Sequence, residues 1–271
     1  MHISEYMENE AIIRLSVFLG LFTVFAVVEA IAPRRARTQT RGRRWLTNWS
    51  MTILNTLTLR AMAFGLPLLA VGAAVDAAQQ GWGLFNWLSA PAWVEVMAAI
   101  LILDLAIWAQ HLITHKVPIL WRLHRVHHAD RDIDVTTAIR FHPVEIGLSM
   151  VLKIGLVYLL GPAALAVILF EILLNGTAMF NHANIRLPLA LDRVVRRVLV
   201  TPDMHRVHHS IHRDEHDSNY GFSLSIWDRL LGTYVAQPRD GHSDMTIGLQ
   251  WQDERPTKLG WSLRLPFVGK P

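Results

Sequence analysis

Two copies of one five-residue pattern, H-R-V-H-H, begin at His124 and at His205, and a further pair, His111 and His115, precedes the first copy at a spacing of four. Imidazole is the commonest metal-binding side chain in proteins. Residues three and four apart share one face of a helix, so each set can direct its rings to one side. The pattern therefore predicts a metal site built from eight residues: His111, His115, His124, His127, His128, His205, His208 and His209.

The composition indicates a membrane protein. Of the 271 residues 52% are hydrophobic and only 18% are charged, and the mean hydropathy is +0.27. The apolar residues form long blocks, which predict membrane-embedded helices at about 11–31, 51–75, 93–115, 145–160 and 162–182. The last two are short and are separated by Gly161-Pro162, a turn signal, so we interpret them as a hairpin that dips into the bilayer or barely crosses it. The alternative, buried helices of a large soluble protein, is disfavoured because few polar residues interrupt the first three blocks.

These features predict an all-α integral membrane protein with four to five membrane-embedded helices and a cytoplasmic histidine-rich helical cap. We expect one domain over residues 1–271, with cytoplasmic histidine-bearing segments at 111–144 and 183–240. The sequence contains no cysteine, which excludes disulfides and thiolate metal ligands. The first apolar block is too long, and its leading end too acidic, for a cleaved signal peptide.

Charged residues predict the orientation in the membrane. Six arginines lie in 34–44, between the first two predicted spans, whereas 76–92 contains no Lys or Arg, and basic residues return after the third and fifth spans. By the positive-inside rule the N-terminus is outside and the histidines face the cytoplasm, in the inner membrane of a bacterium. Nucleic-acid binding by the arginine run is disfavoured, because the run adjoins a predicted span.

Several polar residues could support the histidines from the membrane helices. Asp104 lies seven residues before His111 in the third predicted span, and an acid there is costly unless it has a partner, such as the far nitrogen of a metal-binding imidazole. A water-solvated aspartate is the alternative. His182 ends the fifth predicted span and could cap that helix or bind metal; we favour metal binding, because the topology brings it to the cluster. Asn175 is a possible polar neighbour on the same face.

Two further residues each have two candidate roles. His142, beside Pro143, could lie near the metal site or cap the next helix. Asp203 could cap the helix that carries the second H-R-V-H-H copy, or hold a ligand ring. The remaining histidines match no spacing and are predicted to be surface residues: His2, His212, His216 and His242.

With His182, nine imidazoles are too many for one ion and imply two metals. All-nitrogen ligation suits iron, zinc or copper. A dinuclear site at the membrane boundary fits iron better than zinc, whose structural sites are usually closed and four-coordinate, although purified protein could contain zinc. Two irons can use O₂ to oxidise an unactivated C–H bond, and the spans offer an apolar route for a lipid. No Ser-His-Asp arrangement, Walker loop or dinucleotide-binding glycine motif is present.

Between Asp104 and Tyr234 the ordered motifs H-x-x-x-H, L-W-R-x-H-R-V-H-H, R-F-H-P-x-E, N-H-A-N, T-P-D-M-H-R-V-H-H, N-Y-G and W-D-R-L-L-G-T-Y resemble the fatty acid hydroxylase (sterol desaturase) superfamily. The resemblance implies a membrane di-iron oxygenase that uses O₂ and external electrons to hydroxylate or desaturate a lipid, with all nine histidines as ligands and His142 near the site. Family members often pair a second histidine with the one ending the last span; Ala178 and Arg186 occupy those positions here, so one metal could have a water or an open position. The family's fused haem-binding domain is also missing, which implies a separate electron-donor redox protein.

Two other functions stay open from the sequence. One is a non-enzymatic membrane protein that binds or transports metal, although transporters place ligands near the bilayer midplane on broken helices. The other is a zinc-dependent membrane hydrolase, which needs a general-base carboxylate, and Glu145 and Asp203 are available for that role. The sequence does not distinguish among lipid substrates, nor between hydroxylation and desaturation.

Overall fold

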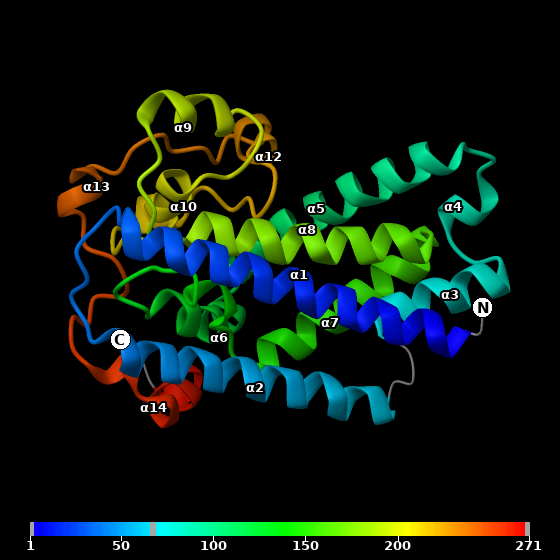
Figure 1. Cartoon of the computed structure of the whole chain (residues 1–271), viewed down its shortest axis with the longest axis horizontal. Helices are drawn as coiled ribbons and strands as arrows, with labels where there is room; N and C mark the ends of the chain where they lie inside the picture. Colours follow the sequence, from blue (N-terminus) through cyan, green and yellow to red (C-terminus); the bar gives the residue numbers. More distant parts are fainter. Residues whose placement is uncertain (1–2, 66–68, 269–271) are drawn as a thin grey trace.

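Long helices in a bundle make up most of the computed structural model, which describes residues 3–65 and 69–268 (Figure 1). Within those residues there is no β-strand, only isolated bridges such as Pro33 to Ile185. The five longest helices are α1 (Ile3–Ile31), α2 (Arg41–Gly65), α5 (Ala92–Lys116), α7 (Pro143–Leu160) and α8 (Ala164–His182). The predicted all-α fold is confirmed.

Four of these helices are long and apolar enough to cross a membrane: α1 from Glu10 to Ile31, α5, α7 and α8. Large apolar side chains such as Ile12, Leu15 and Val24 of α1 are more than 50% exposed on the outside of the bundle. A lipid surround stabilises such a surface, whereas water does not. The chain is therefore a membrane protein, and the predicted spans 11–31, 93–115, 145–160 and 162–182 correspond to helices.

The predicted continuous helix over 51–75 is wrong. The second long helix, α2, begins ten residues earlier, at Arg41, and ends at Gly65; residues 66–68 lie outside the described part of the chain, and α3 (Ala70–Gln80) is a separate helix. The physical reason is in the sequence, because Pro67 cannot continue a helix without losing a backbone hydrogen bond. The alanine-rich α3 packs instead against α7 and α8.

A tight turn joins α7 to α8, as the Gly161-Pro162 pair predicts. Gly161 has φ 60°, in the left-handed region, and its N–H donates to the Val157 carbonyl to end α7. A Cβ at this position would collide with the carbonyl of Trp82 and the side chain of Asn86. Only glycine satisfies both the backbone conformation and the close approach of α4 (Leu84–Trp87).

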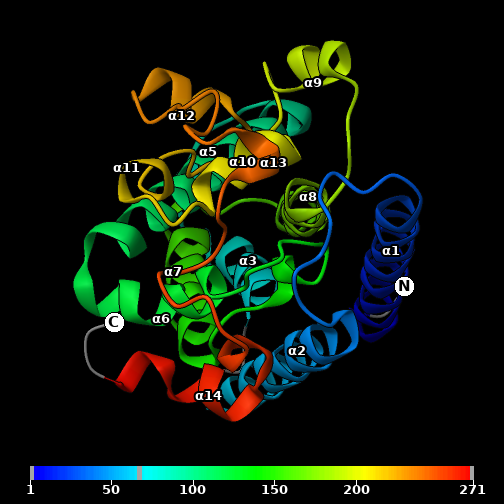
Figure 2. The same ribbon diagram turned by 90° about the vertical axis from the view of Figure 1, so that its left-hand side faces the viewer.

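Apart from α3 and α4, which lie toward the opposite end, the short helices gather at the end of the bundle where α1, α5 and α8 end and α2 and α7 begin (Figures 1 and 2). These helices form the predicted histidine-rich cap. They are α6 (Pro118–His128), α9 (Leu189–Val195), α10 (Pro202–His208), α11 (Arg213–His216), α12 (Ile226–Leu230), α13 (Gly241–Asp244) and α14 (Leu259–Arg264), with short 3-10 turns at Thr137–Ile139, Arg255–Thr257 and Leu265–Phe267.

A buried polar network holds the cap to the bundle. Arg44, at the start of α2, is 1% exposed and donates to Asp130 at 2.7 Å and to Asp134 at 2.6 Å. Glu29, near the end of α1, accepts from the backbone N–H groups of Val135 and Asn184. Burying the Arg44 charge is tolerable only because these partners surround it, so the network fixes the loop that follows α6.

Candidate metal centre

Four segments bring nine histidines into one buried region at the cap end of the bundle. The last turns of α5 carry His111 and His115, α6 carries the first triplet, and α8 ends at His182; α10 carries two members of the second triplet, which His209 completes. None of the nine is more than 6% exposed. They form two groups, His111, His115, His124, His128 and His208 in one and His127, His182, His205 and His209 in the other, and in each the ligand nitrogens lie within 4.8 Å of one another.

In the group of five, His111 and His124 direct bare nitrogens at each other. The Nδ1–H of His111 donates to the Tyr220 carbonyl at 2.7 Å, and the Nδ1–H of His124 donates to Glu145 Oε1 at 2.6 Å. A neutral imidazole has one N–H group, and in each ring it is on Nδ1, so both Nε2 atoms carry lone pairs. These two Nε2 atoms are nevertheless only 3.0 Å apart. Two lone pairs at that distance repel unless a cation lies between them. Nitrogens bound at right angles about 2.1 Å from one ion would be about 3.0 Å apart.

The group of four repeats this arrangement around His182. Its Nδ1–H donates to the Ala178 carbonyl at 2.7 Å, which leaves Nε2 bare. That atom lies 3.0 Å from His127 Nε2 and 3.1 Å from His205 Nε2. In His209 both ring nitrogens are buried and have no hydrogen-bond partner among the described residues. Such unpartnered groups cost about 1–3 kcal/mol each, which metal coordination would remove. Both groups therefore fit a metal ion.

Backbone carbonyls of one loop orient two of the rings. Ser218 O accepts from His208 Nδ1 at 2.7 Å, as Tyr220 O does from His111. These contacts fix the tautomer, so that Nε2 of each ring faces the ligand group. The N-Y-G motif, Asn219 to Gly221, lies in this loop and supplies one of the two carbonyls, that of Tyr220.

Asp228, the aspartate of the W-D-R-L-L-G-T-Y motif, clamps that loop. Its carboxylate is fully buried and accepts from the N–H groups of Tyr220 and Gly221, both at 2.8 Å. It also accepts from Trp108 Nε1 at 2.9 Å and from the Thr233 hydroxyl at 2.7 Å. The carboxylate thus connects α5, α12 and the loop around the histidines.

We expect Asp228→Asn to lower metal affinity by about 10- to 100-fold, because the amide cannot accept from all four donors and the carbonyls that orient His111 and His208 would shift. Competition with a coloured chelator measures this. Asp240→Asn is the matched control, since Asp240 is exposed and pairs with the half-buried His212, outside both histidine groups. Equal metal retention in the two variants would contradict the assigned role.

Burial keeps the cap histidines neutral. The pKa values of His127, His128, His205, His208 and His209 are lowered well below 6.5, first by burial and then by neighbouring histidines. Neutral imidazoles carry the lone pairs that a metal needs.

This gives a pH prediction for the metal-free protein. An unfolded chain takes up protons on these rings as the pH falls through about 6.5, whereas the folded protein takes them up only at lower pH. The free energy of unfolding should therefore be highest above about pH 7 and decrease progressively as the pH falls below 6.5. Thermal unfolding in detergent between pH 8 and pH 5 tests this. A midpoint that stays constant or rises on acidification would contradict it.

Asp104 and Asn175, which the sequence suggested as neighbours of the histidines, hydrogen-bond to other groups. Asp104 Oδ2 accepts from Trp227 Nε1 at 2.8 Å and from the Leu224 N–H, so it holds the cap segment in place of a histidine ring. Asn175 Nδ2 donates to the Glu171 carbonyl within α8 and lines a cavity. Neither hydrogen-bonds to any of the nine histidines.

The remaining predicted residues have structural contacts. Asp203 forms an ion pair with Arg34 at 3.1 Å and a second with Arg206, while the cap of α10 is Thr201. His142 takes the second of its two considered roles: it caps α7, its Nδ1 accepting from the Val144 N–H at 3.2 Å.

The prediction that His242 is a surface residue is wrong, because it is only 8% exposed, against Asp203. His212 and His216 are half-buried, and His216 stacks on Trp121. His2 lies outside the described residues.

Glu145 is the supporting residue that sequence reasoning missed. It was considered only as a hydrolytic base, whereas its carboxylate orients His124. The R-F-H-P-x-E motif held the signal, since a glutamate in the first turn of a helix beside a histidine cluster can accept from a ligand ring.

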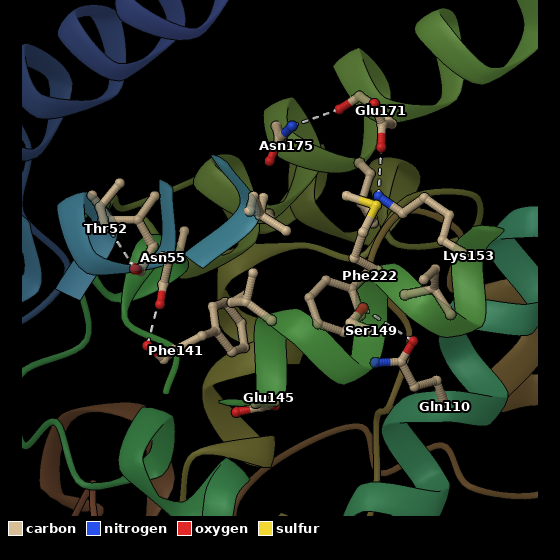
Figure 3. A pocket seen from close by; sticks show the side chains of 18 of the residues that line it. Thr52, Asn55, Gln110, Phe141, Glu145, Ser149, Lys153, Glu171, Asn175 and Phe222 are labelled. Carbon is tan, nitrogen blue, oxygen red and sulfur yellow. Dashed lines mark hydrogen bonds and ion pairs between the residues drawn. The ribbon is translucent and has the colours of Figure 1, made fainter. Parts of the chain in front are cut away.

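A cavity of about 320 Å³ extends from His111 and His124 into the bundle, lined by residues of α1, α2, α5, α7 and α8 (Figure 3). Most of its wall is apolar, with Ile107, Phe141 and Phe222 among the lining side chains. The cavity therefore extends from the histidines between the apolar helices of the bundle.

Comparison with known proteins identifies the family. Residues 96–233, 138 of the 271, match the fatty acid hydroxylase family, so the chain belongs to it. The matched region contains all nine clustered histidines, Glu145 and Asp228. No solved structure matches the chain.

The chain is similar to proteins that are named as lipid hydroxylases and monooxygenases. The chain is 27% identical over 236 residues to ornithine lipid hydroxylase OlsE of Rhizobium tropici, covering 85% of this chain and 70% of that protein. It is 26% identical over 236 residues to a cholesterol 25-hydroxylase-like protein of Danio rerio, covering 81% and 87%. Human alkylglycerol monooxygenase is 33% identical over 164 residues, covering 58% of this chain and only 34% of that longer protein.

Proposed function

We propose that this protein is a membrane-bound di-iron oxygenase that uses O₂ and external electrons to hydroxylate or desaturate a C–H bond of a lipid. The observation that carries the proposal is the pair of buried histidine groups with facing bare nitrogens, next to an apolar cavity. The names of the relatives, each a lipid hydroxylase or monooxygenase, support lipid C–H oxidation.

The nine histidines would hold two metal ions, one in each group. Five imidazoles exceed a closed four-coordinate zinc site, and nitrogen-rich ligation together with O₂ chemistry favours iron, although zinc could replace it in purified protein. The bound metals would supply the activation of O₂. The His182 group has four imidazoles, one fewer than the other group. Residue 178, where a further histidine could stand, is an alanine whose carbonyl orients His182. The smaller ligand set supports a position for an exogenous ligand on that metal.

The protein's own residues would position the lipid and keep water out. Phe141, Phe222 and Ile107 line the cavity beside His111 and His124, so an alkyl segment there would displace solvent from the reacting bond. Hydroxylation consumes the C–H substrate, O₂, two electrons and two protons, and yields an alcohol and water. Desaturation consumes the same electrons and protons and yields an alkene and two waters. A separate redox protein would supply the electrons.

The basic loops support a topology with the N-terminus outside and the histidines facing the cytoplasm, in a bacterial inner membrane. The same topology argues against metal transport, because the histidine groups lie at the end of the spans, not at their middle. Asp203 is committed to arginines, which argues against its use as a hydrolytic base.

The test compares lipids of cells that express the wild type or His124→Ala under heavy-isotope O₂. We expect wild-type cells alone to contain a lipid that has gained one labelled oxygen or lost two hydrogens. Metal flux into proteoliposomes with identical lipid profiles in both cultures would support the transporter instead and overturn the oxygenase.

A further inference from the structure

Three charged side chains from three membrane helices meet beside the cavity. Lys153 Nζ of α7 lies 2.5 Å from Glu171 Oε1 of α8, and Arg14 of α1 lies 2.6 Å from Glu171 Oε2. Arg14 also pairs with Glu10 at 2.7 Å. Charges inside membrane spans are costly and mark functional sites by default. The histidine chemistry does not use this Lys153–Glu171–Arg14 cluster.

The cluster opens onto the cavity and has hydrogen-bond donors to spare. Lys153 and Glu171 line it together with Gln110 and Ser149 (Figure 3), and Arg14 is also among the lining residues. Lys153 carries three N–H groups, and in the described part of the chain its one hydrogen bond goes to Glu171. An ion pair that only tied helices together would not need to face a cavity. Spare N–H donors beside a carboxylate suit a hydroxyl, which can accept from the ammonium and donate to the carboxylate.

The helical rise of α7 and α8 fixes the spacing between the cluster and the histidines. Lys153 lies eight residues along α7 from Glu145, the partner of His124, or about 12 Å at the helical rise. Glu171 lies eleven residues along α8 from His182, or about 17 Å. Ile146, Met150 and Leu174 line the cavity. One end of the cavity therefore offers hydrogen bonds, the other offers the metal ligands.

We propose that the Lys153–Glu171–Arg14 cluster binds an oxygen-bearing polar group of the lipid substrate, a hydroxyl or similar acceptor, and thereby sets which carbon is oxidised. This rests on the proposed function. The substrate is an elongated lipid whose reacting carbon lies about 12–17 Å from that polar group. Since an extended chain advances about 1.3 Å per carbon–carbon bond, this corresponds to about 9–13 bonds. A plain hydrocarbon has no group for this site to bind.

A binding experiment tests the anchor without requiring oxidation. Purified metal-loaded protein in detergent is titrated with hexadecan-1-ol and with hexadecane, and the thermal midpoint gives the apparent affinities. We expect the wild type to bind the alcohol about tenfold more tightly than the alkane, as one hydrogen bond to a charged group predicts. Lys153→Met should abolish the preference and leave alkane binding unchanged. Tyr158→Phe on the same helix, which loses only a contact to Asp76 outside the cavity, should behave as wild type.

Lys153→Arg keeps the ion pair with Glu171 and covers the case in which Lys153→Met does not fold. Because the guanidinium reaches further into the cavity, the tightest-binding alcohol in a series of 8 to 18 carbons, which spans the length estimated from the helical rise, should become shorter. A wild type without alcohol preference, a preference that survives in Lys153→Met, or an unchanged optimum in Lys153→Arg would each overturn the anchor. Absence of lipid oxidation with the preference intact would overturn the oxygenase and leave the polar-group site standing.

Discussion

Replacing His182 with alanine is expected to abolish lipid oxidation and to halve the metal content of the protein. His182 is the centre of its group, because its Nε2 lies 3.0 Å from His127 and 3.1 Å from His205. Its loss leaves three imidazoles in the group and removes the ring that lies between His127 and His205. The group of five is built from other residues and should keep its ion.

Elemental analysis and oxidation assays on the same preparations measure both effects. His212→Ala is the matched control, since His212 is half-buried and pairs with Asp240, outside both groups. We expect the control to retain two metals and full activity, and the His182 variant to retain about one metal with activity lower by at least about 10³-fold, the scale of losing a cofactor's chemistry. Two retained metals and ordinary turnover in His182→Ala would contradict the assignment.

Removal of the metals should strongly destabilise the folded protein. The lone pairs of the nine buried rings then face one another without a cation between them. The segments from α5, α6, α8 and α10 also lose the metal ions that they would bind in common. A ligand present at a thousand times its Kd stabilises the folded state by about 4 kcal/mol per site, so stripping two sites should lower the thermal midpoint by many degrees.

Thermal unfolding in detergent, before and after anaerobic treatment with a strong chelator, measures the loss. Addition of ferrous iron should restore the midpoint, which separates metal loss from chemical damage. A midpoint that is unchanged although elemental analysis shows the metal gone would mean that the histidine groups are stable without ions.

Periodicity made the histidine core predictable. The spacings of three and four residues place His124, His127 and His128 on adjoining helical positions, and apolar length placed α5 and α8 so that their ends meet them. His182 was predicted as a ligand from topology alone, because the fifth predicted span ends on the same side of the membrane as the histidine cluster. Four of the five predicted spans followed from the apolar pattern, and the helical cap followed from the histidine spacing, whereas the single-domain organisation and the orientation in the membrane stay predictions.

The contacts between segments far apart in the chain could not be predicted from the sequence. The oxygens that orient His111 and His208 are backbone carbonyls, which have no residue signature, and Asp228 reaches them from a separate helix. Asp104 sits on the expected helix, but an indole and a backbone N–H of the cap, brought close only by folding, take its carboxylate. The predicted helix over 51–75 failed because the prediction followed the apolar composition of the segment and gave no weight to Pro67.

X-ray absorption at the iron edge, with elemental analysis of protein reconstituted anaerobically with ferrous iron, tests the central claim most directly. We predict two irons per chain, each surrounded mainly by imidazole nitrogens. One iron or none per chain, or irons surrounded mainly by oxygen, would contradict the two-metal histidine centre.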